Sequence, residues 1–212
     1  MPTDHTSHDK AQVAGLLLAA GGGRRLGGRP KALLTYRGRP LIEHAVRALR
    51  EGGCEPVHIV LGAAAEAVRA KAELPGCTLV DNPDWAEGMG SSLRAGLASL
   101  ADTRAGAEAG TEAGAALVML VDQPGIGAAA VARVAAAYDG PSCLAAAVYG
   151  GQRGHPALFG AERWAEVAAS AVGDRGARAY LKEHQSEVTL VDCSDIARPD
   201  DIDTPEDLKR LD

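Results

Sequence analysis

Six short runs rich in apolar residues are spaced along the chain, most of them bounded by glycine, proline or charged residues. Such runs are typical of strands that are buried on both faces. They cover residues 13–19, 57–61, 78–81, 117–121, 144–149 and 188–191. Segments with helical periodicity or helix-boundary residues lie at 40–50, 63–72, 91–100, 131–138, 175–183 and 205–211, and serine caps are expected for the third.

Strands that alternate with helices predict an α/β fold of the doubly wound type, with a mainly parallel sheet and helices on both faces. Residues 1–12 are polar and predict a disordered tail, and residues 13–212 are expected to form a single domain. Residues 101–115 have the low-complexity sequence ADTRAGAEAGTEAGA, which predicts an exposed loop or a frayed helix end.

Composition and charge exclude several classes of protein. The chain has 212 residues and only 3% are aromatic, so one core must be built from alanine, valine, leucine and isoleucine. A net charge of −6 argues against non-specific nucleic-acid binding. No window approaches the run of about twenty apolar residues that a membrane helix needs, so no membrane partner is expected.

The cysteines and the N-terminal residues indicate a cytoplasmic protein. Cys54, Cys77, Cys143 and Cys193 form no CxxC pair and have no histidine at zinc-finger spacing, which predicts reduced and mostly buried thiols. The start of the chain, MPTDHTSHDK, is polar and partly acidic, unlike a secretory signal.

A glycine-rich, basic turn follows the first apolar run, in the stretch 15-GLLLAAGGGRRLGGRPKALL-34. Glycine at three consecutive positions permits positive φ and close approach of a ligand, and successive backbone N–H groups form an anion-binding concavity. Arginine adds bidentate donors to phosphate, and Lys31 adds a point charge. The turn therefore predicts a polyphosphate site; a glycine turn with solvated arginines is the alternative.

Familiar nucleotide and nucleophile motifs are absent from the chain. Residues 23–28 read GRRLGG and lack the Lys-Ser/Thr pair of a P-loop. Leu26 stands where a dinucleotide fingerprint needs its third glycine, and residues 90–94 do not supply the GxSxG of a hydrolase. The position of the turn is still informative, because ligands of parallel sheets bind beyond the carboxyl ends of the strands. Asp122, at the end of the run 117–121, is expected at the same edge.

Several stretches, in order along the chain, resemble the MobA-like NTP-transferase family, and especially its molybdenum cofactor cytidylyltransferase branch. They are LAAGGGRRLGGRPKALL (18–34), VLG (60–62), NPDWAEGMGSSLRAGL (82–97), LVDQP (120–124), YGGQRGHPALF (149–159), GDRGARAYL (173–181) and DIDTPEDL (201–208). The resemblance implies a doubly wound fold of nucleotide-diphosphosugar-transferase type.

The resemblance also implies a nucleotide site. It assigns the triphosphate to Gly21, Gly22, Gly23, Arg25 and Lys31, with Arg24 and Arg29 as flanking charge. It assigns the base and ribose to Leu18, Ala19, Ala20, Asn82, Gly90, Ser91 and Ser92. A simple turn at Asn82 and a helix N-cap at Ser91 or Ser92 are the structural alternatives, although a cap and a ligand role can coexist.

Nucleotidyl transfer needs a divalent cation to neutralise phosphate charge, and the family uses Mg²⁺, with Mn²⁺ as the alternative ion. Magnesium prefers one or two carboxylates together with phosphate oxygens and water. Asp122 ends a buried strand, where an unpaired carboxylate is costly. The resemblance adds Asp203 as the second ligand, although Asp203 or Thr204 could instead cap the helix expected at 205–211. Arg25, Lys31 and Asp122 are then the candidate catalytic residues.

The resemblance places the RGHP stretch and the GDRGAR stretch on the acceptor side of the cleft. His155 and Arg178, with Arg175 beside them, are candidate acceptor contacts, and a structural histidine and solvated arginines are the alternatives. No general base is required, because an acceptor phosphate is already ionised near neutral pH. Catalysis would then consist of alignment and charge stabilisation.

The implied reaction moves a nucleoside monophosphate from an NTP to the terminal phosphate of molybdopterin or molybdenum cofactor and releases pyrophosphate. CTP is the expected donor, because the family's cytidylyltransferases tend to read LAAG where its guanylyltransferases read LAGG, and residues 18–21 read LAAG. A molybdenum hydroxylase is the implied client. Another phosphorylated acceptor, such as a sugar phosphate, and a non-catalytic cofactor carrier are the alternatives.

Overall fold

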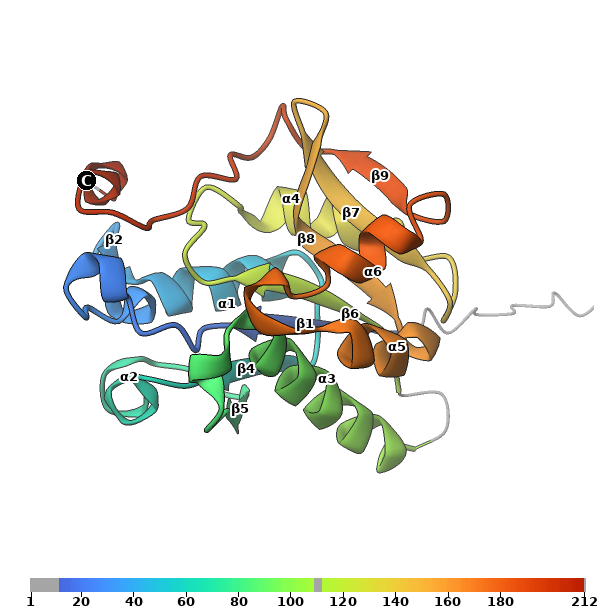
Figure 1. Cartoon of the computed structure of the whole chain (residues 1–212), viewed down its shortest axis with the longest axis horizontal. Coiled ribbons are helices and arrows are strands. Elements are labelled where there is room, and N and C mark those ends of the chain that lie inside the picture. Colours follow the sequence, from blue (N-terminus) through green and yellow to red (C-terminus); the bar gives the residue numbers. More distant parts are fainter. Residues whose placement is uncertain (1–11, 109–111, 212) are drawn as a thin grey trace, which may run out of the picture.

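A seven-stranded sheet forms the centre of the computed structural model, which describes residues 12–108 and 112–211 (Figure 1). The strands are β1 (Gln12–Leu18), β4 (Val57–Leu61), β5 (Thr78–Asp81), β6 (Ala113–Leu120), β7 (Leu144–Tyr149), β8 (Gln152–Gly160) and β9 (Thr189–Asp192). Their order across the sheet is β5-β4-β1-β6-β8-β7-β9. A separate two-stranded sheet joins β2 (Thr35–Tyr36) to β3 (Arg39–Pro40).

The sheet is mainly parallel, as the alternation of strands and helices predicts. β1 pairs in parallel with β4 and with β6, so Leu17 lies beside Ile59 on one side and Met119 on the other. β8 is the exception, because it runs antiparallel to both β6 and β7. The carboxyl ends of β1, β4, β5 and β6 therefore meet at one edge of the sheet.

Helices cover both faces of the sheet (Figure 1). They are α1 (Leu41–Glu51), α2 (Ala65–Lys71), α3 (Met89–Ala105), α4 (Ala128–Ala135), α5 (Trp164–Ser170) and α6 (Arg178–Glu183). Alternation along β1 divides the core: Leu17 packs in the cluster under α1, α2 and α4, whereas Leu16 and Leu18 pack in the cluster under α3, α5 and α6. This is the doubly wound arrangement expected from the sequence.

Several element boundaries differ from the prediction. α3 continues to Ala105 and β6 begins at Ala113, so the stretch 101–115 begins as a mostly exposed helix end, one of the two expected alternatives, and ends as a strand. Residues 109–111 lie outside the described residues. β8 and α5 were not predicted at all. The helix expected over 205–211 is only a 3-10 turn at Asp207–Arg210. The Asp207 side chain accepts hydrogen bonds from the backbone N–H groups of Asp203 and Thr204, just before this turn.

Two other expectations concern the chain as a whole. Residues 1–11 of the predicted tail lie outside the described residues, and Gln12 already belongs to β1. All four cysteines are free thiols; Cys54, Cys143 and Cys193 are buried and Cys77 is half-buried, as predicted. Among the helices that the structure describes, none has the length and apolar character required to cross a membrane.

Candidate active site

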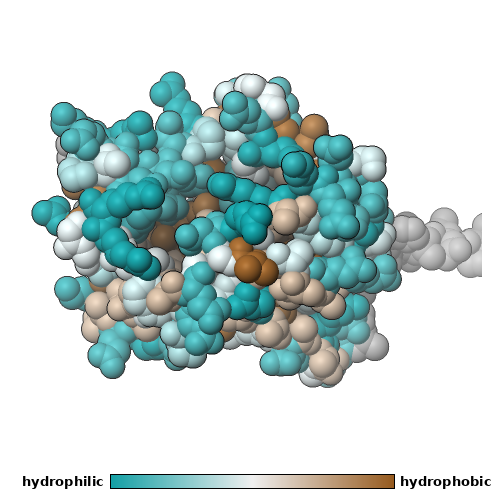
Figure 2. Space-filling view, in the orientation of Figure 1, coloured by the Kyte–Doolittle hydropathy of each residue, from teal (hydrophilic) through white to brown (hydrophobic). Residues whose placement is uncertain are grey.

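A cavity of about 1170 Å³ opens at the carboxyl edge of the parallel strands. Most of the predicted site residues line it: Leu18, Ala20, Gly21, Gly22, Gly23, Arg25, Lys31, Ser92, Asp122, His155, Arg178 and Asp203. Figure 2 shows hydrophilic side chains around a hollow on this face, with hydrophobic residues visible inside it. Segments from across the whole sequence therefore meet at one site.

The glycine turn after β1 lies on this cavity, but its three glycines have different roles. Gly23 has φ 60°, and a Cβ there would lie 1.9 Å from the carbonyl oxygen of Arg29, so only glycine fits. A Cβ on Gly22 would lie 3.3 Å from the Trp85 ring, and one on Gly21 would meet open space. The expected positive φ is therefore confined to Gly23 within this triplet, and Gly21 is the position open to a ligand.

Two carboxylates and two cations form a cluster beside the turn. Lys31 Nζ donates to Asp122 Oδ2 at 2.6 Å and also to Asp203 Oδ1. Arg25 Nη1 donates to Asp203 Oδ2 at 3.2 Å, with the Arg25 side chain 77% exposed. The cluster joins the end of β6, the 3-10 turn Lys31–Leu33 and the C-terminal segment.

The segment that carries Asp203 is fixed by its own hydrogen bonds. Asp207 Oδ2 accepts from the backbone N–H groups of Asp203 and Thr204 at 3.0 and 2.8 Å, and these bonds lower the pKa of Asp207. The backbone N–H of Ile202 donates to the carbonyl oxygen of Asp122. The Asp207 carboxylate, and not that of Asp203, therefore accepts the backbone hydrogen bonds of this turn. The Asp203 carboxylate is left to line the cavity.

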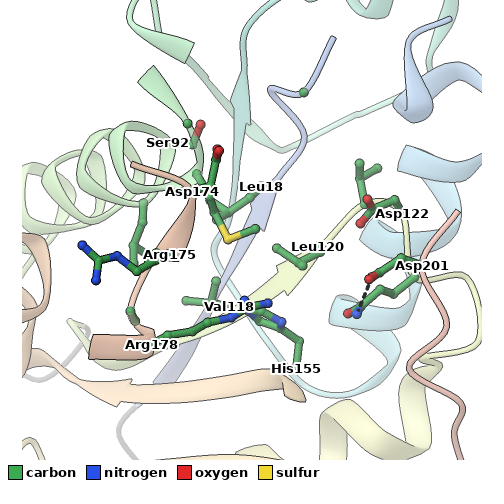
Figure 3. Close-up of a pocket in the computed structure, with 18 of the residues that line it drawn as sticks. Leu18, Ser92, Val118, Leu120, Asp122, His155, Asp174, Arg175, Arg178 and Asp201 are labelled. Carbon is green, nitrogen blue, oxygen red and sulfur yellow. Dashed lines mark hydrogen bonds between the residues drawn. The ribbon is translucent and has the colours of Figure 1, made fainter. Parts of the chain in front are cut away.

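Opposing effects act on the ionisation of the cluster. Burial lowers the pKa of Lys31, but the Asp122 and Asp203 carboxylates outweigh it and raise the pKa above its ordinary value. Burial, together with the charge of Asp122, raises the pKa of the neighbouring Asp201. Gln123 Nε2 donates to Asp201 Oδ1 at 2.8 Å, the bond drawn in Figure 3. The site thus concentrates negative charge around the half-buried ammonium of Lys31.

These residues fit a small divalent cation bound together with phosphate. Asp122 and Asp203 converge on one cationic group from different segments, which shows that a positive charge is stable between them. The described residues contain no cluster of three or more histidine, cysteine or acidic side chains arranged for a metal ion. A pair of carboxylates completed by phosphate oxygens and water is the arrangement that Mg²⁺ prefers.

The segment expected to contact the base and ribose is partly structural. Asn82 is buried; its Nδ2 donates to Ser91 Oγ at 2.9 Å and to Ser92 Oγ at 3.1 Å, and its Oδ1 accepts from the Asp84 backbone N–H. Asn82, Ser91, Gly90 and Ala19 do not line the cavity, whereas Ser92 does. This network holds the loop between β5 and α3 against the wall of the cavity.

The serines do not cap α3 as expected. The helix begins at Met89 with Gly88 as its N-cap, so Ser91 and Ser92 lie within the first turn. Ser91 Oγ donates back to the carbonyl oxygens of Gly88 and Asp84, both at 2.9 Å. The residue in the sequence that marks this boundary is Gly88. It adopts φ 111°, which ends the preceding 3-10 turn and allows the helix to begin two residues earlier than predicted.

His155 and Arg178 lie at the opposite end of the cavity from Asp122. In Figure 3 the Arg178 side chain extends toward His155, with Val118 and Leu120 between this pair and Asp122. Burial and the Arg178 charge lower the pKa of His155 to about 4, so the imidazole is neutral near pH 7. Arg175 also lines the cavity, although its guanidinium points away from His155 in the same view.

Sequence reasoning missed the apolar floor and part of the rim. Val118, Leu120, Ala157, Phe159 and Leu181 form an apolar surface between the two polar ends. Trp85, Met89, Gln123, Arg153, Asp174, Lys182 and Asp201 also line the cavity. The floor carries no motif of its own, because Val118, Ala157 and Phe159 belong to the buried core that lies beneath the cavity.

Comparison with known proteins agrees with this geometry. Residues 15–188 match the MobA-like NTP transferase domain. A nicotine blue oxidoreductase of Paenarthrobacter nicotinovorans is 44% identical, covering 94% of this chain and 96% of its own. A probable molybdenum cofactor guanylyltransferase of Opitutus terrae is 50% identical over 54 residues, which is 26% of each chain.

Solved structures extend the comparison to the fold. The Rv0371c homologue of Mycobacterium sp. strain JC1 has a TM-score of 0.77 at 32% identity, covering 94% of both chains. Rv0371c of Mycobacterium tuberculosis in complex with manganese has a TM-score of 0.74 at 29% identity, covering 95% of this chain and 98% of that one. With its sequence match, its sheet order and its glycine turn, this chain belongs to the MobA-like NTP transferase family.

Proposed function

We propose that this protein transfers a nucleoside monophosphate, CMP by preference, from an NTP to the terminal phosphate of molybdopterin or molybdenum cofactor, with release of pyrophosphate. The observation that carries the proposal is the cluster of Lys31, Asp122 and Asp203 beside the Gly21–Gly22–Gly23 turn in one cavity. A pure cofactor carrier would have no use for such a paired carboxylate and ammonium site next to a phosphate-binding turn.

The chain's own residues would align and neutralise the reacting phosphates. Backbone N–H groups of the turn, with Arg25 and Lys31, would hold the triphosphate. Asp122 and Asp203 would hold Mg²⁺, or Mn²⁺ as in the Rv0371c complex, and the ion would supply charge neutralisation at the α-phosphate. His155 is neutral and needs no proton transfer role, because the attacking phosphate is already ionised.

The shape of the acceptor end favours a pterin over a sugar phosphate. Its floor is apolar, built from Val118, Leu120, Ala157, Phe159 and Leu181. A flat heterocycle buries its faces on such a surface, whereas the hydroxyl groups of a sugar would lose water there without gaining partners. Arg178 and His155 at the rim supply hydrogen-bond donors for the polar edge of a heterocycle.

The first turn supports a preference for CTP. Ala20 is buried and lines the cavity, and we expect its methyl group to narrow the space in which the base would lie. A steric filter of this kind gives a discrimination of about 1–3 kcal/mol, so some use of GTP is expected. Ala20→Gly should shift the ratio of kcat/KM values toward GTP without inverting it fully.

A second candidate function follows from the 44% identical relative that is named a nicotine blue oxidoreductase. Its match covers nearly the whole of both chains. The same cavity could therefore serve to reduce a flat conjugated molecule bound on its apolar floor. Such a reaction needs an electron donor, and a reduced nicotinamide dinucleotide would suit a cavity with a phosphate-binding turn. No pyrophosphate would be released.

The two candidates differ in their products. Purified protein is incubated with Mg²⁺, molybdenum cofactor and CTP, GTP or ATP, and pyrophosphate is measured by a coupled assay. A parallel incubation with NADH or NADPH and a flat conjugated dye is followed by absorbance. The proposed function predicts pyrophosphate that depends on both CTP and cofactor. Oxidation of NADH or NADPH by the dye, without release of pyrophosphate, would favour the second candidate function over the first.

The setting of the reaction is part of the proposal. Four free thiols suit a reducing compartment, so we place the protein in the cytoplasm. A molybdenum hydroxylase would be the client that receives the dinucleotide form of the cofactor. Co-purification of such an enzyme with the protein is the experiment that tests this proposed client.

A further inference from the structure

Lys31 Nζ stands between the two carboxylates to which the proposed function assigns a divalent ion. It lies 2.6 Å from Asp122 Oδ2 and also donates to Asp203 Oδ1. The side chains of Lys31 and Asp122 are only 15% and 18% exposed, so water and salt screen this pair weakly. The ammonium therefore takes the position between the two acids that a divalent ion would also need.

We propose that Lys31 is the counter-ion of Asp122 and Asp203 whenever no nucleotide is bound, and that it must leave them before they can bind a divalent ion. The inference rests on the proposed function only in taking these two acids as the metal ligands. A fixed positive charge at hydrogen-bond distance from both acids opposes any second cation there, and weak screening makes the repulsion stronger.

A triphosphate would give Lys31 a new partner. The glycine turn lies in the same cavity as the cluster, and it is the surface on which phosphate oxygens would be held. Once Lys31 moves to these oxygens, Asp122 and Asp203 lose the ammonium that lies between them, and only the exposed Arg25 still pairs with Asp203. The affinity of the two acids for a divalent ion should then rise. Nucleotide and metal should therefore bind with positive coupling, and linkage requires the coupling to be reciprocal.

Arg25 provides a matched control within the same cluster. It carries the same charge and donates to Asp203 at 3.2 Å, but its side chain is 77% exposed and it contacts only one of the two acids. Removing its charge tests the change in net charge together with the loss of one exposed ion pair to Asp203. Removing the charge of Lys31 also removes the counter-ion from between the acids.

The test measures Mn²⁺ binding by the electron paramagnetic resonance signal of the free ion, in nucleotide-free protein at constant ionic strength. We expect Lys31→Met to bind Mn²⁺ at least about tenfold more tightly than the wild type, within the usual range of a coupling factor. Arg25→Met should change the affinity by less than about threefold, because its charge is exposed to solvent. Equal affinities in wild type and Lys31→Met would overturn the inference.

The position of the side chain gives a second test that does not depend on a folded variant. A crystal structure of the wild type with Mn²⁺ and a non-hydrolysable CTP analogue should show Lys31 Nζ on phosphate oxygens and apart from at least one of the two acids. A structure in which Mn²⁺ and the CTP analogue are both bound, and Lys31 is still bonded to Asp122 and Asp203, would contradict the proposal. Neither experiment depends on the acceptor, so a wrong acceptor would leave the inference standing.

Discussion

At the scale of single residues, the site combines side chains that stabilise the fold with side chains that have no such need. Asn82 is fully engaged in hydrogen bonds with Ser91, Ser92 and the Asp84 backbone, so its presence is explained by structure. Within the described part of the chain, the side-chain carboxylates of Asp122 and Asp203 bond only to Lys31 and Arg25 of their own charged cluster. A cluster that satisfies itself at a cavity is typical of a functional site.

Asp122→Ala should abolish turnover with little loss of stability. We expect pyrophosphate release to fall by about a hundredfold or more, as when a charge-stabilising group is removed from an active site. Asp81→Ala is the matched control, because Asp81 also ends a parallel strand but is exposed and pairs with Arg69 away from the cavity. Near wild-type rates in Asp122→Ala, with a normal melting temperature, would exclude Asp122 from the reaction.

Arg25→Ala should weaken use of the NTP. The expected loss in kcat/KM corresponds to about 1.5–3 kcal/mol, the range for hydrogen bonds to charged groups. Arg29→Ala is the control within the same turn, since Arg29 does not line the cavity. Equal losses in both variants would indicate a diffuse positive surface and not an aimed contact.

His155 predicts a pH dependence of stability. Burial and the Arg178 charge lower its pKa from the ordinary 6.5 to about 4 in the folded protein, so the unfolded chain binds the proton first as pH falls. Stability should therefore be lost between about pH 6.5 and pH 4, at no more than about 1.4 kcal/mol per pH unit. His155→Gln should show a shallower loss of unfolding free energy in urea across this window. An unchanged slope would contradict the lowered pKa of the half-buried His155.

At the scale of elements, the glycine turn shows how local backbone geometry fixes the site. The sequence predicts the turn from its three glycines but does not reveal which of them needs φ > 0. That depends on the later approach of the Arg29 carbonyl to Gly23, a contact set by the path of residues 24–29. A single sequence shows the permissive residues and not the contact that requires them.

Gly23→Ala should therefore destabilise the protein more than Gly27→Ala. Both residues have positive φ, near 60° and 68°, but a Cβ at Gly27 meets nothing within 4 Å. Strain at φ > 0 costs about 1–3 kcal/mol at either position, and the clash with Arg29 adds to it only at Gly23. The difference is measured by urea unfolding; equal losses would mean that the Arg29 segment moves aside freely.

The elements that sequence analysis missed share a physical cause. β8 begins with QRGHP, whose charged, glycine and proline residues do not resemble a strand, and the pairing with β6 and β7 overrides this local preference. β6 begins within the low-complexity stretch, where Ala113 and Ala115 are buried by their neighbours and not by their own hydrophobicity. The central strands β1 and β4 were predictable because each has a single polar residue, Gln12 or His58, in an otherwise apolar run.

At the scale of the whole molecule, the order of the strands brings the site together. Lys31, Asp122 and Asp203 are far apart in the sequence, but they meet because β1 and β6 are neighbours and end at the same edge of the sheet. The general rule for open parallel sheets predicted this convergence for the glycine turn and Asp122. The position of Asp203 could not be derived from the rule, because the C-terminal segment reaches the cavity as an irregular chain.

The most direct test of the account is the release of pyrophosphate by the purified protein with CTP, GTP or ATP, Mg²⁺ and molybdenum cofactor as acceptor. We expect pyrophosphate release that requires the acceptor, with the highest kcat/KM for CTP and a lower but measurable value for GTP. A clear preference for GTP or ATP would contradict the cytidylyl assignment. No release with any nucleotide and this acceptor would contradict the proposed reaction itself.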